Sequence, residues 1–566
     1  MHLKLKLLNS IYVKSLENKF SSFQKALKYS RETQNEILKN IIFNNIETIF
    51  SKENNLPSML TCKKQNLIDE FRKTIPISIY DDLEKYVKLI MDGHNRVLTK
   101  EKVIIFEKSS GSTSSSKYIP YTKSLFNEIH RGTATWIYDL YNTNPSLKNT
   151  KAYWSISPKM GTSEKTKSGI NVGFNDDSEY FGPLERFFIR RILAVDPAVS
   201  ATRDIESCRF ITAKELLEQS DLGLISVWSP TFIIILLEYI ENNIVELLKV
   251  IKVNAKRKKL IENSISINIS KVGEKEKQKL DFLKLWPKLE IVSCWTSASS
   301  AIFLEQLKQN LNGVKIQGKG LFLTEGIVTI PISEYLAPIL AINSHFYEFL
   351  PEDYQEENNF INKNKNTNTS TNINTFLPHE LIVGKKYIPV ITTGGGFYRY
   401  NTNDIVQVEH MVNYVPLLTY VGRADKRSDI CGEKLCETFV ANILSTLDKT
   451  VNIKFSFSML APIVNKNWVP YYGFFCEFNI NLSKSQIEQV ENYIEDQLCK
   501  NYHYNNCRKL NQLKKMKIYK VTNAIKIYEE VITSKDKKKI IGGIKIAYLD
   551  SYPYWLDEFS KRNVLL

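Results

Sequence analysis

The sequence predicts an α/β protein with a large N-terminal domain, in which helices flank β-sheets, and a smaller α+β C-terminal domain. The chain has 566 residues, several times the ~100–200 residues of a common domain, which predicts more than one domain. Short apolar strands alternate with helices between residues 150 and 425, a pattern typical of an α/β core with substantial parallel sheet. The charged segment GRADKRSD then follows a strand, and we place the domains at residues 1–422 and 423–566.

The elements follow in chain order. Residues 15–100 are predicted to be helical, because apolar residues such as Leu16, Phe20 and Phe23 recur at helical spacing. The apolar run Val103–Phe106 ends close to a Ser/Gly cluster, which is typical of a strand that leads into a loop. Further short apolar runs predict the strands Tyr153–Ile156, Glu290–Trp295, Val314–Leu323, Tyr387–Thr392, Ile405–Val408 and Leu417–Val421. The C-terminal part is predicted to hold helices Glu437–Leu447 and Lys484–Cys499 and strands Lys454–Met459 and Tyr471–Ile480.

Composition and charge exclude several classes of protein. No apolar run approaches the ~18–20 residues of a membrane helix, and the basic N-terminus lacks a secretory-signal core, so we expect a cytoplasmic protein without membrane attachment. The net charge of +15 arises from scattered lysines, so we expect no nucleic-acid partner. The polar, low-complexity segment 358–375 is predicted to be a disordered surface insertion in the large domain.

The eight cysteines are sparse and form no CxxC pair, which favours a reducing compartment over a disulfide framework. Cys499, His503 and Cys507 are spaced four residues apart and would share one face of a continuous helix. Two thiolates and an imidazole can bind zinc, but no fourth ligand is evident, and an incidental polar helix face is the favoured interpretation.

A Ser/Gly loop follows the first predicted strand. In Ser109–Lys117 (SSGSTSSSK), Gly111 permits a tight turn, backbone N–H groups and hydroxyls can face a phosphate, and Lys117 adds positive charge. The loop is neither a Walker A motif nor a GxSxG nucleophile elbow. Taken alone, a Ser-rich loop is more often a linker.

Three further motifs follow it in order: Gly318–Ile330 (GKGLFLTEGIVTI), Thr392–Asp404 (TTGGGFYRYNTND) and Tyr420–Glu437 (YVGRADKRSDICGEKLCE). Together with the Ser/Gly loop they resemble the adenylate-forming, firefly luciferase-like enzymes. The specific variants resemble the Gretchen Hagen acyl-acid amido synthetases, the auxin-responsive promoter family. This resemblance runs from about residue 20 to residue 550.

The resemblance implies a ligase that adenylates a carboxylic acid with ATP and Mg²⁺ and then transfers the acyl group to the amine of an amino acid. It implies that the C-terminal domain moves about a hinge at Asp425 and Lys426, and we expect a monomer. The open alternatives are a thiol acceptor, such as coenzyme A or a carrier protein, and a non-catalytic nucleotide-binding relative.

The family's functional residues carry over by motif. The phosphates would be held by Ser109, Ser110, Gly111, Ser112 and Thr113, with Lys117 as an auxiliary charge. Thr324 and Glu325 match the motif in which the glutamate lies against ATP and its Mg²⁺. Tyr398 would lie near adenine, and Asp404 and Arg423 would bind the ribose. From residues alone, Glu325 is more often a solvated carboxylate and Asp404 a turn-capping residue.

The sequence also departs from the family pattern. Ser112 replaces the usual Thr, Ser114 replaces a frequent Gly, and Asn401-Thr402-Asn403 replaces the commoner Arg-x-Gly before Asp404. We assign the catalytic lysine to Lys545, because Gly542-Gly543-Ile544-Lys545 has the Gly-rich context that the family shows near its C-terminus. Lys535 and Lys537–Lys539 are the rival positions.

Overall fold

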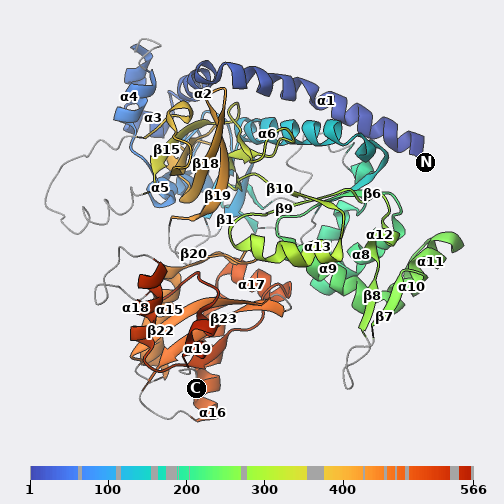
Figure 1. Ribbon diagram of the computed structural model, residues 1–566. Coiled ribbons are helices and arrows are strands. Elements are labelled where there is room, and N and C mark those ends of the chain that lie inside the picture. The colour runs from blue at the N-terminus through green and yellow to red at the C-terminus, as the bar shows by residue number, and fades with distance from the viewer. Residues whose placement is uncertain are drawn as a thin grey trace. The chain divides into compact units, whose positions relative to one another are not determined.

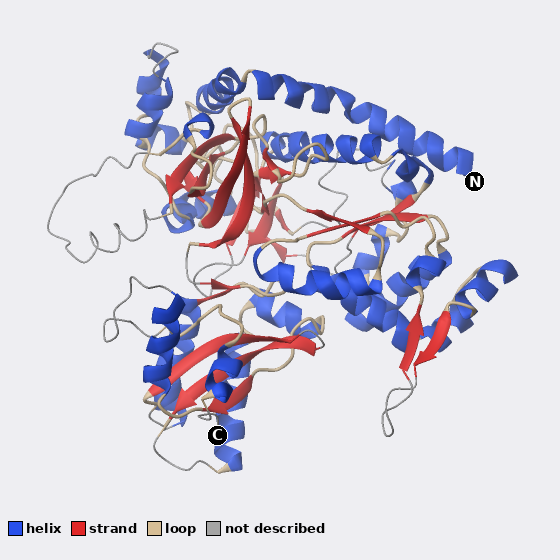
Figure 2. Ribbon diagram, in the orientation of Figure 1, coloured by secondary structure: helices blue, strands red, loops and turns tan. Residues whose placement is uncertain are grey.

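The protein is described by a computed structural model (Figures 1 and 2). It covers residues 2–61, 67–109, 117–154, 164–173, 188, 190–202, 204–268, 277–352, 375–424, 427–451, 455–465, 468–478, 483–535 and 547–562. A larger unit comprises residues 1–109 and 118–424, and a smaller unit comprises residues 110–117 and 425–566. Each unit has its own apolar core. Within the described ranges, no helix has the length and apolar character needed to cross a bilayer.

The larger unit begins with helices that bury an apolar stripe, including Leu16, Phe23 and Leu38. The first helix, α1, lies alongside α6 (Figure 1). The helices of this region are α1 (His2–Lys28), α2 (Ser30–Asn44), α3 (Ile49–Glu53), α4 (Leu67–Thr74), α5 (Tyr80–Met91) and α6 (Lys123–Thr143). The helical prediction for residues 15–100 is therefore confirmed for most of the described part of that range.

A four-stranded sheet in the order β10-β9-β6-β3 is parallel throughout. Its strands are β3 (Lys151–Trp154), β6 (Leu222–Ser226), β9 (Ile291–Cys294) and β10 (Lys315–Gly318). Every residue of β6 and β9 is buried, as expected for central strands that are covered on both faces. The helices that accompany the sheet are α8 (Ile205–Glu218), α9 (Pro230–Asn242), α10 (Ile244–Val250), α11 (Ala255–Glu262), α12 (Phe282–Leu285) and α13 (Leu304–Asn310). A separate hairpin pairs β7 (Ile265–Asn268) with β8 (Lys277–Leu280).

The largest sheet is antiparallel, with β13-β14-β19-β18-β16-β15 in order and β17 paired to β16. Its strands are β13 (Thr329–Ile330), β14 (Ile339–Leu340), β15 (Phe346–Pro351), β16 (Lys386–Thr392), β17 (Tyr400–Asn401), β18 (Asp404–Val412) and β19 (Val415–Arg423). The predicted parallel pairing is therefore found in the preceding sheet, and also where Ile105–Phe106 pair with Asn171–Val172, but not in the largest sheet. The physical reason is local: Asn413 and Tyr414 both have positive φ, 47° and 68°, and close a tight hairpin between β18 and β19.

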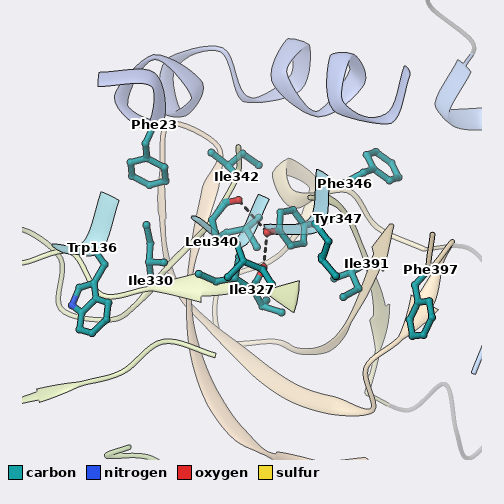
Figure 3. Close-up of a cluster of buried hydrophobic side chains, with 14 of the residues drawn as sticks. Phe23, Trp136, Ile327, Ile330, Leu340, Ile342, Phe346, Tyr347, Ile391 and Phe397 are labelled. Atoms are coloured by element: carbon teal, nitrogen blue, oxygen red, sulfur yellow. Dashed lines mark hydrogen bonds between the residues drawn. The ribbon is translucent and has the colours of Figure 1, made fainter. Parts of the chain in front are cut away.

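Apolar side chains from this sheet and from the N-terminal helices form the main core (Figure 3). Phe23, Ile327, Ile330, Tyr347 and Ile391 are all buried within it. Residues 358–374 of the predicted insertion lie outside the described residues. Thr375, its last residue, is buried.

Two small sheets complete the larger unit. One has the order β2-β1-β5-β4, and the other is the β11–β12 hairpin. Their strands are β1 (Ile105–Ser109), β2 (Lys117–Tyr121), β4 (Glu164–Lys165), β5 (Asn171–Val172), β11 (Phe322–Leu323) and β12 (Gly326–Ile327).

The smaller unit is α+β, as predicted. β22 (Phe457–Asn465) pairs antiparallel with β23 (Trp468–Glu477), and β23 pairs parallel with β24 (Lys517–Lys520). Aromatic residues, among them Phe475 and Trp555, fill its core. The remaining elements are β20 (Arg427–Ser428), β21 (Leu435–Cys436), α15 (Glu437–Val451), α16 (Lys484–Leu498), α17 (Tyr502–Lys509), α18 (Ala524–Lys535) and α19 (Trp555–Lys561).

Candidate active site

Thr324 and Glu325 form the two-residue turn of the β11–β12 hairpin, between the paired residues Leu323 and Gly326. Both side chains are half-buried. The Tyr121 hydroxyl donates a hydrogen bond of 2.7 Å to the Thr324 carbonyl oxygen. Tyr121 ends strand β2, which Lys117 begins, so the strand that follows the predicted phosphate loop is bonded to the turn that carries Glu325.

Tyr400 brings a second motif to the same turn. Its hydroxyl donates a hydrogen bond of 3.0 Å to Glu325 Oε1. The Tyr400 ring lies 5.0 Å from the Phe397 ring, which in turn contacts Tyr80 edge-on at 6.4 Å. Burial raises the pKa of the Tyr80 phenol to about 12, and the carboxylate charges of Glu84 and Glu325 add to the shift. The Glu325 carboxylate is therefore half-buried and has phenol groups around it. A carboxylate in such a position can face a ligand.

Tyr398 is placed differently from the prediction. Its side chain is fully buried, its ring stacks on Phe50 at 4.5 Å with an interplanar angle of 6°, and its hydroxyl donates to the Leu98 carbonyl oxygen at 3.0 Å. Burial raises the pKa of this phenol well above its ordinary value. A ring that is covered in this way belongs to the core, and no surface of it is available to adenine in this structure. The tyrosine of this motif that reaches the site is Tyr400.

Arg399 anchors the segment between the two tyrosines. It has a φ of 45°, and its guanidinium donates to both oxygens of Glu348, at 3.0 and 2.9 Å. Its Nη1 also donates to the carbonyl oxygens of Arg72 and Ile75, at 2.8 and 2.6 Å. Arg399 and Glu348 are both almost completely buried, so a two-bond, charge-assisted pair fixes the backbone that carries Tyr400.

Asp404 and Arg423 lie opposite each other, at the start of β18 and the end of β19. Arg423 Nη1 donates to Asp404 Oδ1 at 3.1 Å, and Arg423 Nη2 donates to the Thr402 carbonyl oxygen, also at 3.1 Å. Asn403 has a φ of 58°, in the left-handed region that favours glycine but also tolerates asparagine. The departure from Gly at this position therefore preserves the backbone turn that leads into Asp404.

The structure describes the two ends of the predicted phosphate loop, Ser109 and Lys117. Ser109 ends strand β1, and Lys117 begins β2 with a half-buried side chain. Outside the described residues lie Ser110, Gly111, Ser112 and Thr113 of the phosphate loop, Asp425 and Lys426 of the hinge, and Lys545. Their assigned roles stay predictions.

The Cys499, His503 and Cys507 trio does not share one helix, because α16 ends at Leu498 and α17 begins at Tyr502. Cys507 instead clusters with Cys431 and Glu433, and their donor atoms all lie within 4.8 Å of one another. Burial raises the pKa of both the Cys431 thiol and the Glu433 carboxyl.

The Glu433 oxygens already accept hydrogen bonds from the Ile430 and Cys431 N–H groups and the Tyr472 hydroxyl. Among the described residues this cluster offers three donors, one fewer than the four of a structural zinc site. The cluster is therefore adequately explained as a buried, hydrogen-bonded part of the smaller unit.

Sequence reasoning did not identify Tyr121 or assign a role to Tyr400. Tyr400 lies within the motif Thr392–Asp404, and Tyr121 lies four residues after Lys117, the end of the Ser/Gly loop; these positions were the only local signals. The site as described holds one carboxylate with two phenols around its turn, and a carboxylate–guanidinium pair where β18 begins and β19 ends. Such groups can hold a hard cation and the hydroxyls of a sugar.

Comparisons with known proteins give a consistent result. The sequence profile of the GH3 family N-terminal domain matches residues 19–316, and that of the GH3 family central domain matches residues 338–423. Indole-3-acetic acid-amido synthetase GH3.4 of Arabidopsis thaliana is 22% identical over 459 residues, covering 73% of this chain and 71% of its own. Jasmonoyl–L-amino acid synthetase JAR6 of Nicotiana attenuata is 21% identical over 381 residues, covering 63% of each chain.

The structure of AtGH3.15 acyl acid amido synthetase in complex with 2,4-DB superposes with a TM-score of 0.62 at 16% identity. The superposition covers 98% of this chain and 97% of that one. At this identity the likeness shows a shared fold, and it confirms the predicted α/β architecture with a large N-terminal and a smaller C-terminal domain.

Proposed function

This chain belongs to the GH3 family, as its motifs predicted, and on that premise we propose that it is an acyl-acid amido synthetase. Its substrates would be ATP, a carboxylic acid and the amine of an amino acid. The observation that carries the proposal is the hydrogen bond from Tyr400 to Glu325, which joins two separate nucleotide-site motifs at one turn.

The reaction has two steps. A carboxylate oxygen of the acid attacks the α-phosphorus of ATP, the bond to pyrophosphate breaks, and an acyl-adenylate forms. The amine nitrogen of the amino acid then attacks the acyl carbon, the bond to AMP breaks, and the amine loses a proton. Adenylation is needed because oxide is a poor leaving group, whereas AMP leaves readily from the mixed anhydride. The protein aligns the acid with the phosphate and stabilises the charge that develops.

Different residues of the chain would bind the phosphates, bind the ribose and stabilise the developing charge. The 109–117 loop would hold the phosphates, with Lys117 adding positive charge, and Asp404 and Arg423 would bind the ribose. Lys545 would approach the α-phosphate from the smaller domain, which would move about Asp425 and Lys426 between the two steps. The assignment of Lys117 is supported by the bond from its own strand, through Tyr121, to the Glu325 turn.

A magnesium ion fits the donors at this turn. Glu325 offers a half-buried carboxylate, and the Tyr400 phenol donates to only one of its two oxygens in the contacts described above. Oxygen donors of this kind are those Mg²⁺ prefers. When bound, the ion would neutralise negative charge on the nucleotide phosphates.

The test is a pyrophosphate-release screen of the purified protein over carboxylic acids, crossed with the twenty amino acids. We expect release that requires one acid class, ATP and Mg²⁺, and an amide product with one or a few amino acids. A thioester formed with coenzyme A, in place of an amide, would assign the thiol acceptor instead. Absence of both ATP binding and pyrophosphate release would contradict the proposal.

Two finer points belong to the same proposal. We propose that the enzyme acts in the cytoplasm, which the sparse cysteines support, since a reducing compartment suits unpaired thiols. We also propose that it acts as a monomer, which light scattering of the purified protein tests directly.

A further inference from the structure

A buried histidine and a buried glutamate connect the Glu325 hairpin to the glycine-rich loop before Tyr398. His345 Nε2 accepts a hydrogen bond of 3.0 Å from the Ile327 N–H, two residues after Glu325. His345 Nδ1 lies 2.8 Å from Glu128 Oε2. Glu128, on α6, also accepts from the Gly394 N–H, at 2.9 and 3.0 Å to its two oxygens. The chain of bonds therefore runs from β12 through two side chains to the loop.

The direction of these bonds fixes the state of His345. A backbone N–H can only donate, so Nε2 must be the unprotonated, accepting nitrogen. The proton of the neutral ring is then on Nδ1, which donates it to the Glu128 carboxylate. Both side chains are buried, and each makes hydrogen bonds to other groups of the protein, as buried polar groups generally do.

Glycine occupies each end of this connection. A Cβ added at Gly326 would lie 2.6 Å from His345 Nε2, and one added at Gly394 would lie 2.5 Å from Glu128 Oε1. Contacts this short require the neighbouring atoms to shift. The sequence therefore keeps space for the two polar side chains at the points where they approach the backbone.

Other bonds hold the same two segments. The Tyr347 hydroxyl donates to the Ile327 carbonyl oxygen at 2.7 Å, so both sides of that residue's backbone are fixed (Figure 3). Thr122, which caps α6, donates to the Gly394 carbonyl oxygen at 2.8 Å. Gly394 is thus held through both its N–H and its carbonyl group by the start of α6.

We propose that His345 and Glu128 are positioning residues that set the location of the Glu325 carboxylate relative to the glycine-rich loop and Tyr400. They would act through the backbone of Ile327 and Gly394, without touching substrate. This inference rests on the proposed function of Glu325 in holding Mg²⁺ with ATP. Its consequence is specific: disturbing the pair should weaken the metal-dependent part of nucleotide binding.

Glu128→Gln tests this with little change in size. In one amide orientation the glutamine NH₂ group faces His345 Nδ1–H and cannot accept its proton. In the other it faces the Gly394 N–H, which both oxygens of Glu128 accept in the wild type. Either orientation sets two donors against each other and weakens the connection. His345→Ala removes the connection outright. For both variants we expect the half-saturating Mg²⁺ concentration for acid-dependent pyrophosphate release to rise about ten-fold. ATP binding measured by calorimetry without a divalent ion should be unchanged.

Asn9→Leu is the matched control. Asn9 is equally buried, and it donates to the Lys148 and Thr150 carbonyl oxygens, both at 3.0 Å, but no described contact joins it to His345, to the hairpin or to Gly394. We expect it to lower the melting temperature while leaving the Mg²⁺ dependence as in the wild type. If His345→Ala does not fold, Glu128→Gln carries the test.

Failure of this inference can be distinguished from failure of the proposed function. If the wild type is active and the Glu128 and His345 variants lose stability but keep the wild-type Mg²⁺ dependence, this inference is overturned and the proposed function stands. If the wild type binds no ATP in the presence of Mg²⁺, the proposed function fails, and the inference fails with it.

Discussion

The Tyr400 hydroxyl donates a 3.0 Å hydrogen bond to Glu325 Oε1, across 75 residues of sequence. The two residues belong to motifs that lie at separate strand ends, and their contact places a carboxylate and a phenol at one position. Tyr398, two residues earlier, points instead into the core. The two tyrosines that flank Arg399 therefore differ in role: Tyr398 supports the fold, and Tyr400 contacts the candidate site.

Tyr400→Phe should separate these two roles. Loss of the hydroxyl removes one hydrogen bond to a carboxylate, so we expect the binding of Mg²⁺ with ATP to weaken by about 0.5–1.5 kcal/mol, measured by calorimetry. Tyr398→Phe, which loses its bond to Leu98, should lower the melting temperature without changing that affinity. Equal effects of the two variants on ATP affinity would contradict the distinction.

Asp404→Asn should abolish the preference for ATP over a nucleotide that lacks a ribose hydroxyl group. If the Asp404 carboxylate accepts hydrogen bonds from ribose hydroxyls, the wild type should bind ATP about ten-fold more tightly than 3′-deoxy-ATP, and the variant should bind both alike. Glu409→Gln, at an exposed position of the same strand, is the control. A variant that keeps the wild-type preference would show that Asp404 serves only as the partner of Arg423.

His503 should make the smaller unit acid-sensitive. Burial lowers its pKa to about 3, whereas an unfolded histidine titrates near 6.5. As the pH falls below about 6.5 the unfolded chain takes up a proton that the folded chain does not, so the stability falls with pH, by about 1.4 kcal/mol at pH 5.5. We therefore expect the melting temperature of His503→Gln to fall less than that of the wild type between pH 7.5 and pH 5.5.

The exposed His94 provides the comparison for that measurement. His94→Gln should show the wild-type pH dependence, because this substitution removes a histidine of the larger unit and leaves the surroundings of His503 unchanged. An unchanged pH dependence in His503→Gln would mean that other groups account for the acid sensitivity.

Much of the fold was predictable because its signals are local. Glu325 and Arg423 each come just after a predicted apolar strand, and Asp404 comes directly before one, so the sequence marked all three positions. The pairing of Asp404 with Arg423 follows from a hairpin whose turn, Asn413-Tyr414, lies midway between them. The antiparallel nature of the largest sheet was missed, since alternation of strands and helices gives no direct signal for strand direction.

The non-local contacts could not be predicted from the sequence. Residues two apart on a regular strand share a face, which would place Tyr398 and Tyr400 together, but Arg399 has a φ of 45° and separates them. Nothing in the sequence indicated that value. His345 and Glu128 are 217 residues apart and show no pattern, so only the packing of β12 against α6 reveals their connection.

Lys545→Ala should separate the two half-reactions. If Lys545 contacts the α-phosphate only during adenylation, the variant should lose acid-dependent pyrophosphate release by about 10²–10³-fold, the usual effect of removing one preorganised charge. ATP binding should remain close to normal, because the larger domain would supply most nucleotide contacts. Given chemically prepared acyl-adenylate, the variant should still form the amide at a near-normal rate.

Lys535→Ala, at the end of α18, is the control and should adenylate normally. If Lys545→Ala adenylates at the wild-type rate, the catalytic lysine lies elsewhere, and Lys537–Lys539 are tested next. Glu325→Ala differs in kind: it should lose metal-dependent ATP binding and adenylation together, because its carboxylate would serve the nucleotide in both domain arrangements.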